Sequence, residues 1–205
     1  MANPYQTIYL ASASPRRREL LKQIGVRFEV MLLRASPSRI EVDETPILGE
    51  NPRDYVLRLA RVKAEVGNAV FRARHLPAYP VLAADTTVTL DGDIIGKPVN
   101  RAEAELILAR LSGRRHEVLT AVAMALDDKV EVALSVSSVD FARLDAPTIK
   151  RYVTSGESQD KAGAYAIQGK AAAFVTRLEG SYSGVMGLPL CETTQLLQKF
   201  GIEVI

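Results

Sequence analysis

Hydroxyl and guanidinium side chains gather at one predicted helix start near the N-terminus, in the stretch LASASPRRR. Ser14 followed by proline is a typical N-cap and first helical residue. Backbone N–H groups at a helix start lack partners, Ser12 lies beside them, and the forks of Arg16 and Arg17 match phosphate oxygens. Cations are unfavourable there because the helix dipole is positive. The stretch therefore predicts a bound phosphate, with acidic partners for the arginines or their exposure to solvent as the alternatives.

A single carboxylate interrupts a predicted apolar strand, at Asp85 in PVLAADTTVTL. A buried carboxylate without a partner is costly and becomes protonated instead. Asp85 therefore requires a cation, a metal ion or several N–H donors close by. The alternative is an aspartate that only bonds the local backbone at the end of the strand.

An acidic run, Glu41, Asp43 and Glu44, lies in a polar stretch at about residues 34–50. Its carboxylate oxygens suit Mg²⁺ or Mn²⁺, which takes one or two carboxylates together with the phosphates of a substrate. The alternative is an acidic loop that is solvated and holds no metal.

Two lysines could neutralise the charge of a phosphate. Lys63 borders the apolar stripe of a helix predicted at residues 52–70, four residues after Leu59, so it either reaches inward to an anion or extends to water. Lys97 stands in a Gly-Lys-Pro turn, where a lysine is either functional or simply exposed. With the helix start and the carboxylates, these lysines complete the parts needed for metal-assisted attack of water on a phosphoanhydride.

The elements that must position these residues alternate between strand and helix patterns, and Asp91-Gly92 is a strong hairpin signal. This arrangement predicts an α/β fold with a mixed sheet flanked by helices. No repeat or linker divides the chain, so residues 1–205 are predicted to form a single domain with two lobes. Strands are predicted at 7–11, 26–33, 80–90, 115–126, 130–143 and 173–178, and helices at 15–24, 52–70, 101–111, 146–154 and 189–199.

The composition narrows the class of protein. The 26 Lys and Arg and 24 Asp and Glu residues are interspersed and give a net charge of only +2, which argues against nucleic-acid binding. The absence of a signal peptide and of a long apolar run predicts a cytoplasmic protein with no membrane contact. A single cysteine, Cys191, excludes an intrachain disulfide and a cysteine-rich zinc site. Neither a P-loop nor a GxGxxG turn is present.

Eight short motifs occur in one order from about residue 8 to residue 200, and together they resemble the Maf family of house-cleaning nucleoside triphosphate pyrophosphatases. The motifs are Ser-x-Ser-Pro-Arg-Arg, Val-Asp-Glu, Leu-Ala-x-x-Lys-Ala, Ala-Asp-Thr, Gly-Lys-Pro, Leu-Ser-Gly, Asp-Lys-Ala-Gly-Ala-Tyr-x-Ile-Gln-Gly and Val-Met-Gly-Leu-Pro.

The resemblance implies a two-lobed fold like that of the inosine-triphosphate pyrophosphatases, with the active-site cleft between the lobes, and a homodimer. It also implies metal-dependent hydrolysis of a nucleoside triphosphate to the monophosphate and pyrophosphate, with Mg²⁺ or Mn²⁺. One branch of the family prefers dTTP, UTP and modified pyrimidine triphosphates, and another prefers 7-methylguanosine triphosphate. Arg16, Thr86 and Gln168 match the first branch at the positions that read the base.

Residue roles follow from the same resemblance. Asp85 matches the group that takes a proton from the attacking water, and Glu44 and Asp85 match the metal ligands, with Asp43 as the alternative to Glu44. Lys161 is expected to face the cleft. The phosphate-binding residues are expected to be Ser12, Ser14, Arg16, Arg17, Lys63 and Lys97.

Two other functions stay open. One is a pyrophosphatase for non-standard purine triphosphates on a similar fold. The other is a non-catalytic nucleotide-binding regulator of cell division and septum formation. The joint presence of Asp85, Lys63 and Lys97 favours an enzyme, because a protein that only binds has no need of this arrangement of acid and base.

Overall fold

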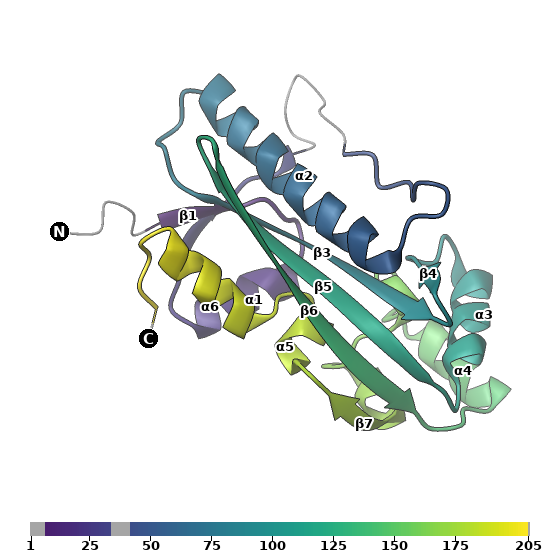
Figure 1. Cartoon of the computed structure of the whole chain (residues 1–205). Helices are drawn as coiled ribbons and strands as arrows, with labels where there is room; N and C mark the ends of the chain where they lie inside the picture. Colours follow the sequence, from purple (N-terminus) through teal and green to yellow (C-terminus); the bar gives the residue numbers. More distant parts are fainter. Residues whose placement is uncertain (1–6, 34–41, 205) are drawn as a thin grey trace.

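The computed structural model describes residues 7–33 and 42–204, and within them one mixed sheet of seven strands carries the fold (Figure 1). The strand order is β2-β1-β3-β5-β6-β7, and β4 pairs with β3 beside this path. β1 is parallel to β2 and β3, whereas the remaining pairs are antiparallel. The predicted α/β class with a mixed sheet is confirmed. The strands are β1 (Thr7–Leu10), β2 (Arg27–Val30), β3 (Val81–Leu90), β4 (Asp93–Ile95), β5 (Arg115–Leu126), β6 (Lys129–Phe141) and β7 (Val175–Glu179).

The helices and strands follow the predicted ranges closely except at four places. β2 covers only Arg27–Val30 of the strand predicted at 26–33. α2 runs three residues beyond its predicted end, and the strand predicted at 173–178 begins only after a 3-10 turn. α5 was missed, because a helix of five residues is too short to show an apolar period. The helices are α1 (Pro15–Gln23), α2 (Pro52–Ala73), α3 (Arg101–Leu111), α4 (Ala146–Thr154), α5 (Tyr182–Met186) and α6 (Leu190–Lys199), with 3-10 turns η2 (Ala162–Ala164) and η3 (Lys170–Phe174).

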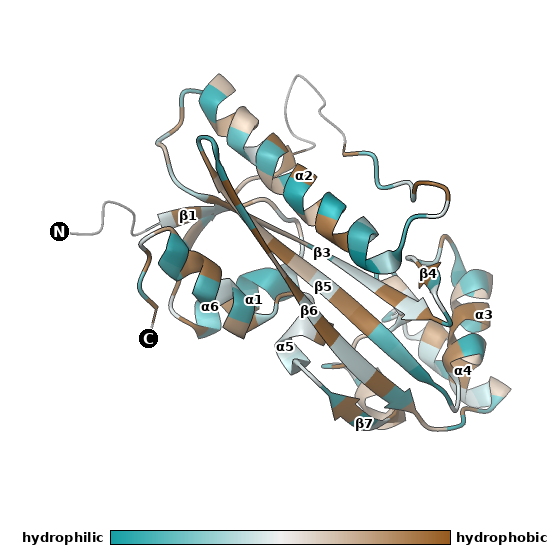
Figure 2. Cartoon of the chain, in the orientation of Figure 1, coloured by the Kyte–Doolittle hydropathy of each residue, from teal (hydrophilic) through white to brown (hydrophobic). Residues whose placement is uncertain are grey.

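α2 covers one face of the sheet (Figure 1). Its apolar stripe, which includes Val56, Ala60 and Ala64, packs against odd-numbered residues of β3 and β5 such as Val81 and Ala121. Figure 2 shows the resulting banding of α2, with apolar and hydrophilic residues alternating along the helix. The small residues at this contact bring the helix close to the strands, so a side chain on the inner side of α2 can reach the sheet.

The other face carries two separate apolar clusters. One joins α1 and α6 to the start of β3, and the other joins α3 and α4 to its end. Between them the strands present hydroxyl groups instead of apolar side chains, at Thr86, Thr120, Ser135 and Ser137. The short helix α5 lies over this hydroxyl belt, where Thr120 donates to the carbonyl of Gly184 at 2.8 Å.

The sheet has a gap in its hydrogen bonding beside this belt. β5 occupies one edge of β3 from Val81 to Thr89. On the opposite edge, β1 pairs only with Val81 and Leu82, and β4 pairs only from Val88 onward. Residues 83–87 of β3 therefore have no strand beside them on that edge within the described part of the chain. The chain turns from β1 into α1 next to this gap, which brings the predicted phosphate-binding residues toward Asp85.

None of the helices in residues 7–33 and 42–204 is long and apolar enough to cross a membrane.

The close approach of α2 to β3 gives a stability prediction at Gly67. A Cβ atom placed on Gly67 would lie 2.6 Å from Cγ1 of Val81, which is fully buried. Alanine raises helix propensity by about 1 kcal/mol over glycine, but overpacking typically costs about 1–3 kcal/mol. We expect Gly67→Ala to lower the free energy of unfolding, measured in urea, by about 1 kcal/mol relative to the wild type. In a Val81→Ala background, where the clashing methyl group is gone, we expect Gly67→Ala to raise the free energy of unfolding relative to Val81→Ala alone. A stabilising Gly67→Ala in the wild-type background would contradict this account.

Candidate functional site

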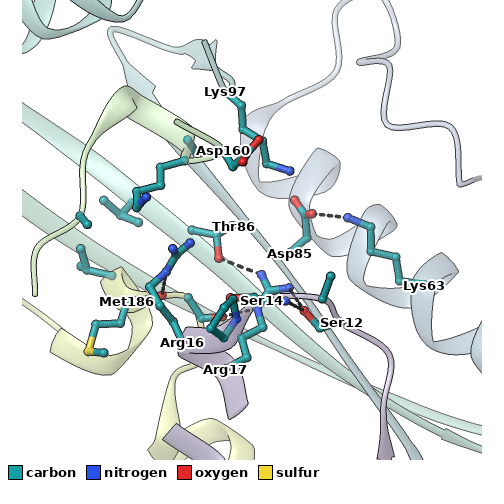
Figure 3. A pocket seen from close by; sticks show the side chains of 18 of the residues that line it. Ser12, Ser14, Arg16, Arg17, Lys63, Asp85, Thr86, Lys97, Asp160 and Met186 are labelled. Atoms are coloured by element: carbon teal, nitrogen blue, oxygen red, sulfur yellow. Dashed lines mark hydrogen bonds and ion pairs between the residues drawn. The ribbon is translucent and has the colours of Figure 1, made fainter. Parts of the chain in front are cut away.

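A pocket of about 740 Å³ opens at the gap in the sheet and collects the site residues predicted from the sequence. Figure 3 shows how side chains from the turn after β1, from α1, α2 and β3, and from the turn after β4 point into it. Asp43 is not among the lining residues; its carboxylate accepts a hydrogen bond from the backbone of Thr45 at 2.9 Å. Glu41 lies outside the described residues. The predicted residues that line the pocket are Ser12, Ser14, Arg16, Arg17, Glu44, Lys63, Asp85, Thr86, Lys97, Lys161 and Gln168.

Two carboxylates share one ammonium group at the gap. Nζ of Lys63 lies 2.7 Å from Oδ1 of Asp85 and 2.7 Å from Oε1 of Glu44 (Figure 3 draws the first contact). The side chains of Lys63 and Asp85 are 14% and 12% exposed. Lys63 therefore reaches inward from α2 instead of extending to water, and Asp85 has a cation as its partner instead of only the local backbone. Because burial and the charges of Asp85 and Glu44 disfavour a phenolate, the pKa of nearby Tyr55 is raised to about 12.

Arg17 connects the start of α1 to three other segments. Its Nε donates to the carbonyl of Gly187 at 2.8 Å, and its two terminal nitrogens donate to the hydroxyls of Ser12 at 3.2 Å and Thr86 at 3.4 Å. Burial lowers the pKa of Arg17, and the negative charge of Asp85 opposes this shift. The guanidinium is thus held in a fixed orientation at the edge of the pocket.

All three arginines of the first turn of α1 donate hydrogen bonds to backbone carbonyls. The sequence analysis considered phosphate, acidic side chains and solvent as their partners, but not carbonyls. Arg16 donates to Met186 at 3.3 Å, Arg17 to Gly187 and Arg18 to Ala13 at 3.2 Å. The carbonyls of Met186 and Gly187 belong to the C-terminal end of α5, where carbonyls lack helical partners and carry partial negative charge. Two of the three cations at one helix start are therefore balanced by the end of another helix.

Ser14 occupies the N-cap position of α1, as predicted, but its side chain makes no capping hydrogen bond. Its backbone N–H donates to the hydroxyl of Ser12 at 3.2 Å instead. Both hydroxyls line the pocket at the helix start, where an anionic ligand would meet them.

Thr120 is a site residue that sequence reasoning missed. It is fully buried, and its Oγ1 lies 3.0 Å from Oγ1 of Thr86 and 2.8 Å from the carbonyl of Gly184. A hydroxyl has one proton and a carbonyl can only accept, so Thr120 donates to Gly184 and accepts from Thr86. Thr86 in turn accepts from Arg17. The signal in the sequence was a lone threonine within the apolar run of the strand predicted at 115–126.

The glycine-rich segment after α4 forms the opposite wall. Gly163 has a φ of +69°, and a Cβ atom there would lie 2.8 Å from Cγ2 of Val88, so a glycine lets this wall approach β3. Lys161 faces the pocket as predicted, and its pKa is lowered by burial and then by the charge of Arg16. Gln168 and Lys97 are exposed at the rim. The apolar part of the lining is Val88, Val118, Ala162, Tyr165, Val185 and Met186.

The pocket thus has a cationic part and an apolar part, a division that suits the phosphates and the base of a nucleotide. Within residues 7–33 and 42–204 no group of three or more His, Cys, Asp and Glu side chains could hold a metal ion. Glu44 and Asp85 supply two carboxylates, and Mg²⁺ takes one or two when phosphate oxygens and water complete its coordination.

The family model for Maf-like proteins matches residues 7–200. The chain belongs to the Maf family. It is 54% identical over 198 residues to a dTTP/UTP pyrophosphatase of Nitrosomonas europaea, with 96% of each chain covered. It is 53% identical over 204 residues to a dTTP/UTP pyrophosphatase of Ralstonia nicotianae, covering 99% of this chain and 98% of the relative. Among solved structures, the Staphylococcus aureus Ham1 protein is similar over 66% of this chain and 72% of its own, with a TM-score of 0.46 and 20% identity.

Tyr165, in the wall of the pocket, contacts a buried histidine, and this histidine gives a prediction on how stability depends on pH. Nε2 of His116 lies 2.9 Å from the hydroxyl of Tyr165, and burial lowers the pKa of His116 to about 4. Unfolded histidine titrates near pH 6.5, so between about pH 6.5 and 4 the unfolded state binds more protons. We expect the free energy of unfolding to fall as the pH drops through this window, by up to about 1.4 kcal/mol per pH unit.

Urea unfolding between pH 7 and pH 5 measures this slope, the change in the free energy of unfolding per pH unit. This pH range lies above the one in which most carboxylates titrate. His116→Gln keeps a polar partner for Tyr165 and should reduce the slope, whereas His75→Gln, at the other histidine, which is exposed, should leave it unchanged. An equal slope in His116→Gln and the wild type would show that His116 is not the titrating group.

Proposed function

We propose that this chain is a nucleoside triphosphate pyrophosphatase that hydrolyses dTTP and UTP, and modified pyrimidine triphosphates, to the monophosphate and pyrophosphate. The observation that carries the proposal is the position of Asp85. Its carboxylate and that of Glu44 both contact the ammonium group of Lys63. Asp85 also faces a pocket that is lined by Arg16, Arg17 and Lys97. The names of relatives that are 53–54% identical over nearly the whole chain support the choice of substrate.

Asp85 is the proposed general base. Its Oδ1 is held by Lys63, and no group of residues 7–33 and 42–204 donates a hydrogen bond to Oδ2. Oδ2 can therefore accept a proton from a water molecule that attacks the α-phosphorus. The contact with Lys63 fixes the direction of the carboxylate, so that the base is oriented before the substrate binds.

The cationic side chains are proposed to hold the triphosphate. Ser12, Ser14 and the start of α1 would contact phosphate oxygens through O–H and N–H groups, and the guanidinium forks of Arg16 and Arg17 would do so with charge. Lys63 and Lys97 would neutralise the charge that develops on the leaving pyrophosphate.

Glu44 and Asp85 would hold a divalent cation, Mg²⁺ or Mn²⁺. When bound, such an ion stabilises negative charge on the phosphate oxygens during attack. Both carboxylates contact the same ammonium group, which supports the proposal that they share one dication.

Arg16, Thr86 and Gln168 are the proposed readers of the pyrimidine. Thr86 donates its proton to Thr120, so toward the pocket it offers an oxygen lone pair. Arg16 retains terminal N–H groups beyond its bond to Met186, and Gln168 offers both a donor and an acceptor at the rim. The homodimer and the cytoplasmic location that the family resemblance implies stay predictions.

Replacing the base tests the mechanism. Asp85→Asn keeps an oxygen for Lys63 but cannot take a proton, so we expect kcat for dTTP to fall roughly 100- to 10,000-fold with an unchanged unfolding midpoint. Asp93→Asn removes an exposed carboxylate that pairs with Arg110 and is the control, with no loss of kcat expected. Full turnover by Asp85→Asn would overturn the assignment of the base.

Product analysis by ion-exchange chromatography tests the substrate and the metal. With Mg²⁺ or Mn²⁺ we expect dTMP or UMP and pyrophosphate from dTTP and UTP, little product from 7-methyl-GTP and ITP, and no turnover in EDTA. Preference for ITP would favour the purine pyrophosphatase instead. Binding of all four nucleotides without turnover, by a folded protein, would favour the non-catalytic regulator.

A further inference from the structure

The loop that carries Glu44 is held to α2 by a two-pronged ion pair. Nε of Arg58 lies 2.6 Å from Oε1 of Glu50, and its terminal nitrogen lies 2.7 Å from Oε2. The side chain of Glu50 is only 8% exposed, and that of Arg58 is 28% exposed. A parallel pair of hydrogen bonds of this kind fixes direction as well as distance.

The same two side chains also bind the backbone of the loop. Arg58 donates to the carbonyl of Thr45 at 3.3 Å, and Glu50 accepts from the N–H of Ile47 at 3.1 Å. One turn earlier on α2, the hydroxyl of Tyr55 donates to the carbonyl of Glu44 itself at 2.9 Å. Polar contacts from α2 therefore reach the loop at three points, one of them on the residue that enters the pocket.

Apolar packing does not explain how this loop is held. Residues 43–49 are all exposed, including Ile47 and Leu48, so no apolar side chain of that segment anchors it. Between residues 42 and 51, Glu44 is the one residue that lines the pocket, and neither Arg58 nor Tyr55 lines it. Within the pocket, these contacts therefore place one group, the carboxylate of Glu44, whose Oε1 lies 2.7 Å from Nζ of Lys63.

We propose that the Arg58–Glu50 pair, assisted by Tyr55, positions Glu44 beside Asp85 and so sets the binding of the metal–nucleotide complex. Arg58 and Glu50 are positioning residues, since they act through Glu44 and do not touch the reacting groups. α2 then controls Glu44 in two ways: Tyr55 and Arg58 bind the loop backbone at Glu44 and Thr45, and Lys63 binds the carboxylate of Glu44. This inference rests on the proposed function, because it assigns Glu44 a role in that reaction.

A double-mutant cycle with Glu44 tests the proposal. Arg58→Gln and the isosteric Glu50→Gln each break the pair, and each should lower kcat/KM for UTP and weaken binding of α,β-methylene-UTP with Mn²⁺, measured by calorimetry, by about 10- to 100-fold. The analogue cannot be cleaved between its α- and β-phosphorus atoms, so binding is read without turnover. In a Glu44→Gln background, Arg58→Gln should weaken binding less than twofold further, because its effect passes through Glu44.

Arg61→Gln is the matched control. Arg61 lies on the same helix, one turn beyond Arg58, and forms an exposed pair with Glu65 at 3.7 Å, so its loss should leave binding and kcat/KM within twofold of wild type. Equal losses from Arg58→Gln with and without Glu44 would assign the pair a general structural role and overturn the proposal, as would unchanged binding in Glu50→Gln. Failure of the proposed function would look different, because the wild-type protein itself would then not hydrolyse UTP.

Discussion

The ammonium group of Lys63 is the interaction on which the site depends. It neutralises two carboxylates that approach each other at the gap in the sheet, and without it Asp85 would be a buried charge next to Glu44. Arg17, whose guanidinium feels the charge of both carboxylates, brings this group of four side chains close to zero net charge. A triphosphate would add several negative charges to a site that is already balanced. The further cations that line the pocket, Arg16, Lys97 and Lys161, would balance part of that added charge.

The gap in the sheet explains how neighbouring residues of one strand serve the same pocket. Successive side chains of a strand point to opposite faces, so Asp85 faces α2 and Thr86 faces α5. In the middle of a sheet two such side chains would be separated by the backbone and its neighbours. Because β1 ends at Leu10, opposite Leu82, and β4 ends at Ile95, opposite Val88, the edge of β3 is open at this point, and both side chains reach one cavity.

The sequence predicted the elements that have a clear period, and it predicted which side chains gather. α2 showed an apolar stripe, β3 and β5 were apolar runs, and the carboxylates, lysines and arginines all stood out by their type. It could not predict partners that lie far along the chain. The carbonyls of Met186 and Gly187 bind arginines 170 residues away, and backbone carbonyls leave no mark in a sequence. Thr120 looked like one polar residue in an apolar strand until Thr86 and Gly184 were placed beside it.

The loop that carries Glu44 and the glycine-rich segment after α4 are each fastened by a carboxylate. Glu50 accepts from the backbone of Ile47 and from Arg58, and Glu157 accepts from the backbone of Lys170 at 3.0 Å and from the hydroxyl of Tyr152 at 3.0 Å. A Cβ atom on Gly169 would lie 2.3 Å from Glu157, so the second fastening requires a glycine. The loop at residues 43–49 is exposed and buries little apolar area, so charge-assisted hydrogen bonds are its means of attachment, whereas the second segment also packs Ala164, Tyr165 and Ile167 into the apolar core. Catalysis by electrostatic stabilisation works only when charges and dipoles are oriented before the reaction, because reorganising them would raise the barrier. Fastened in this way, the exposed loop of Glu44 and the partly buried segment after α4 can both hold their charged groups in place.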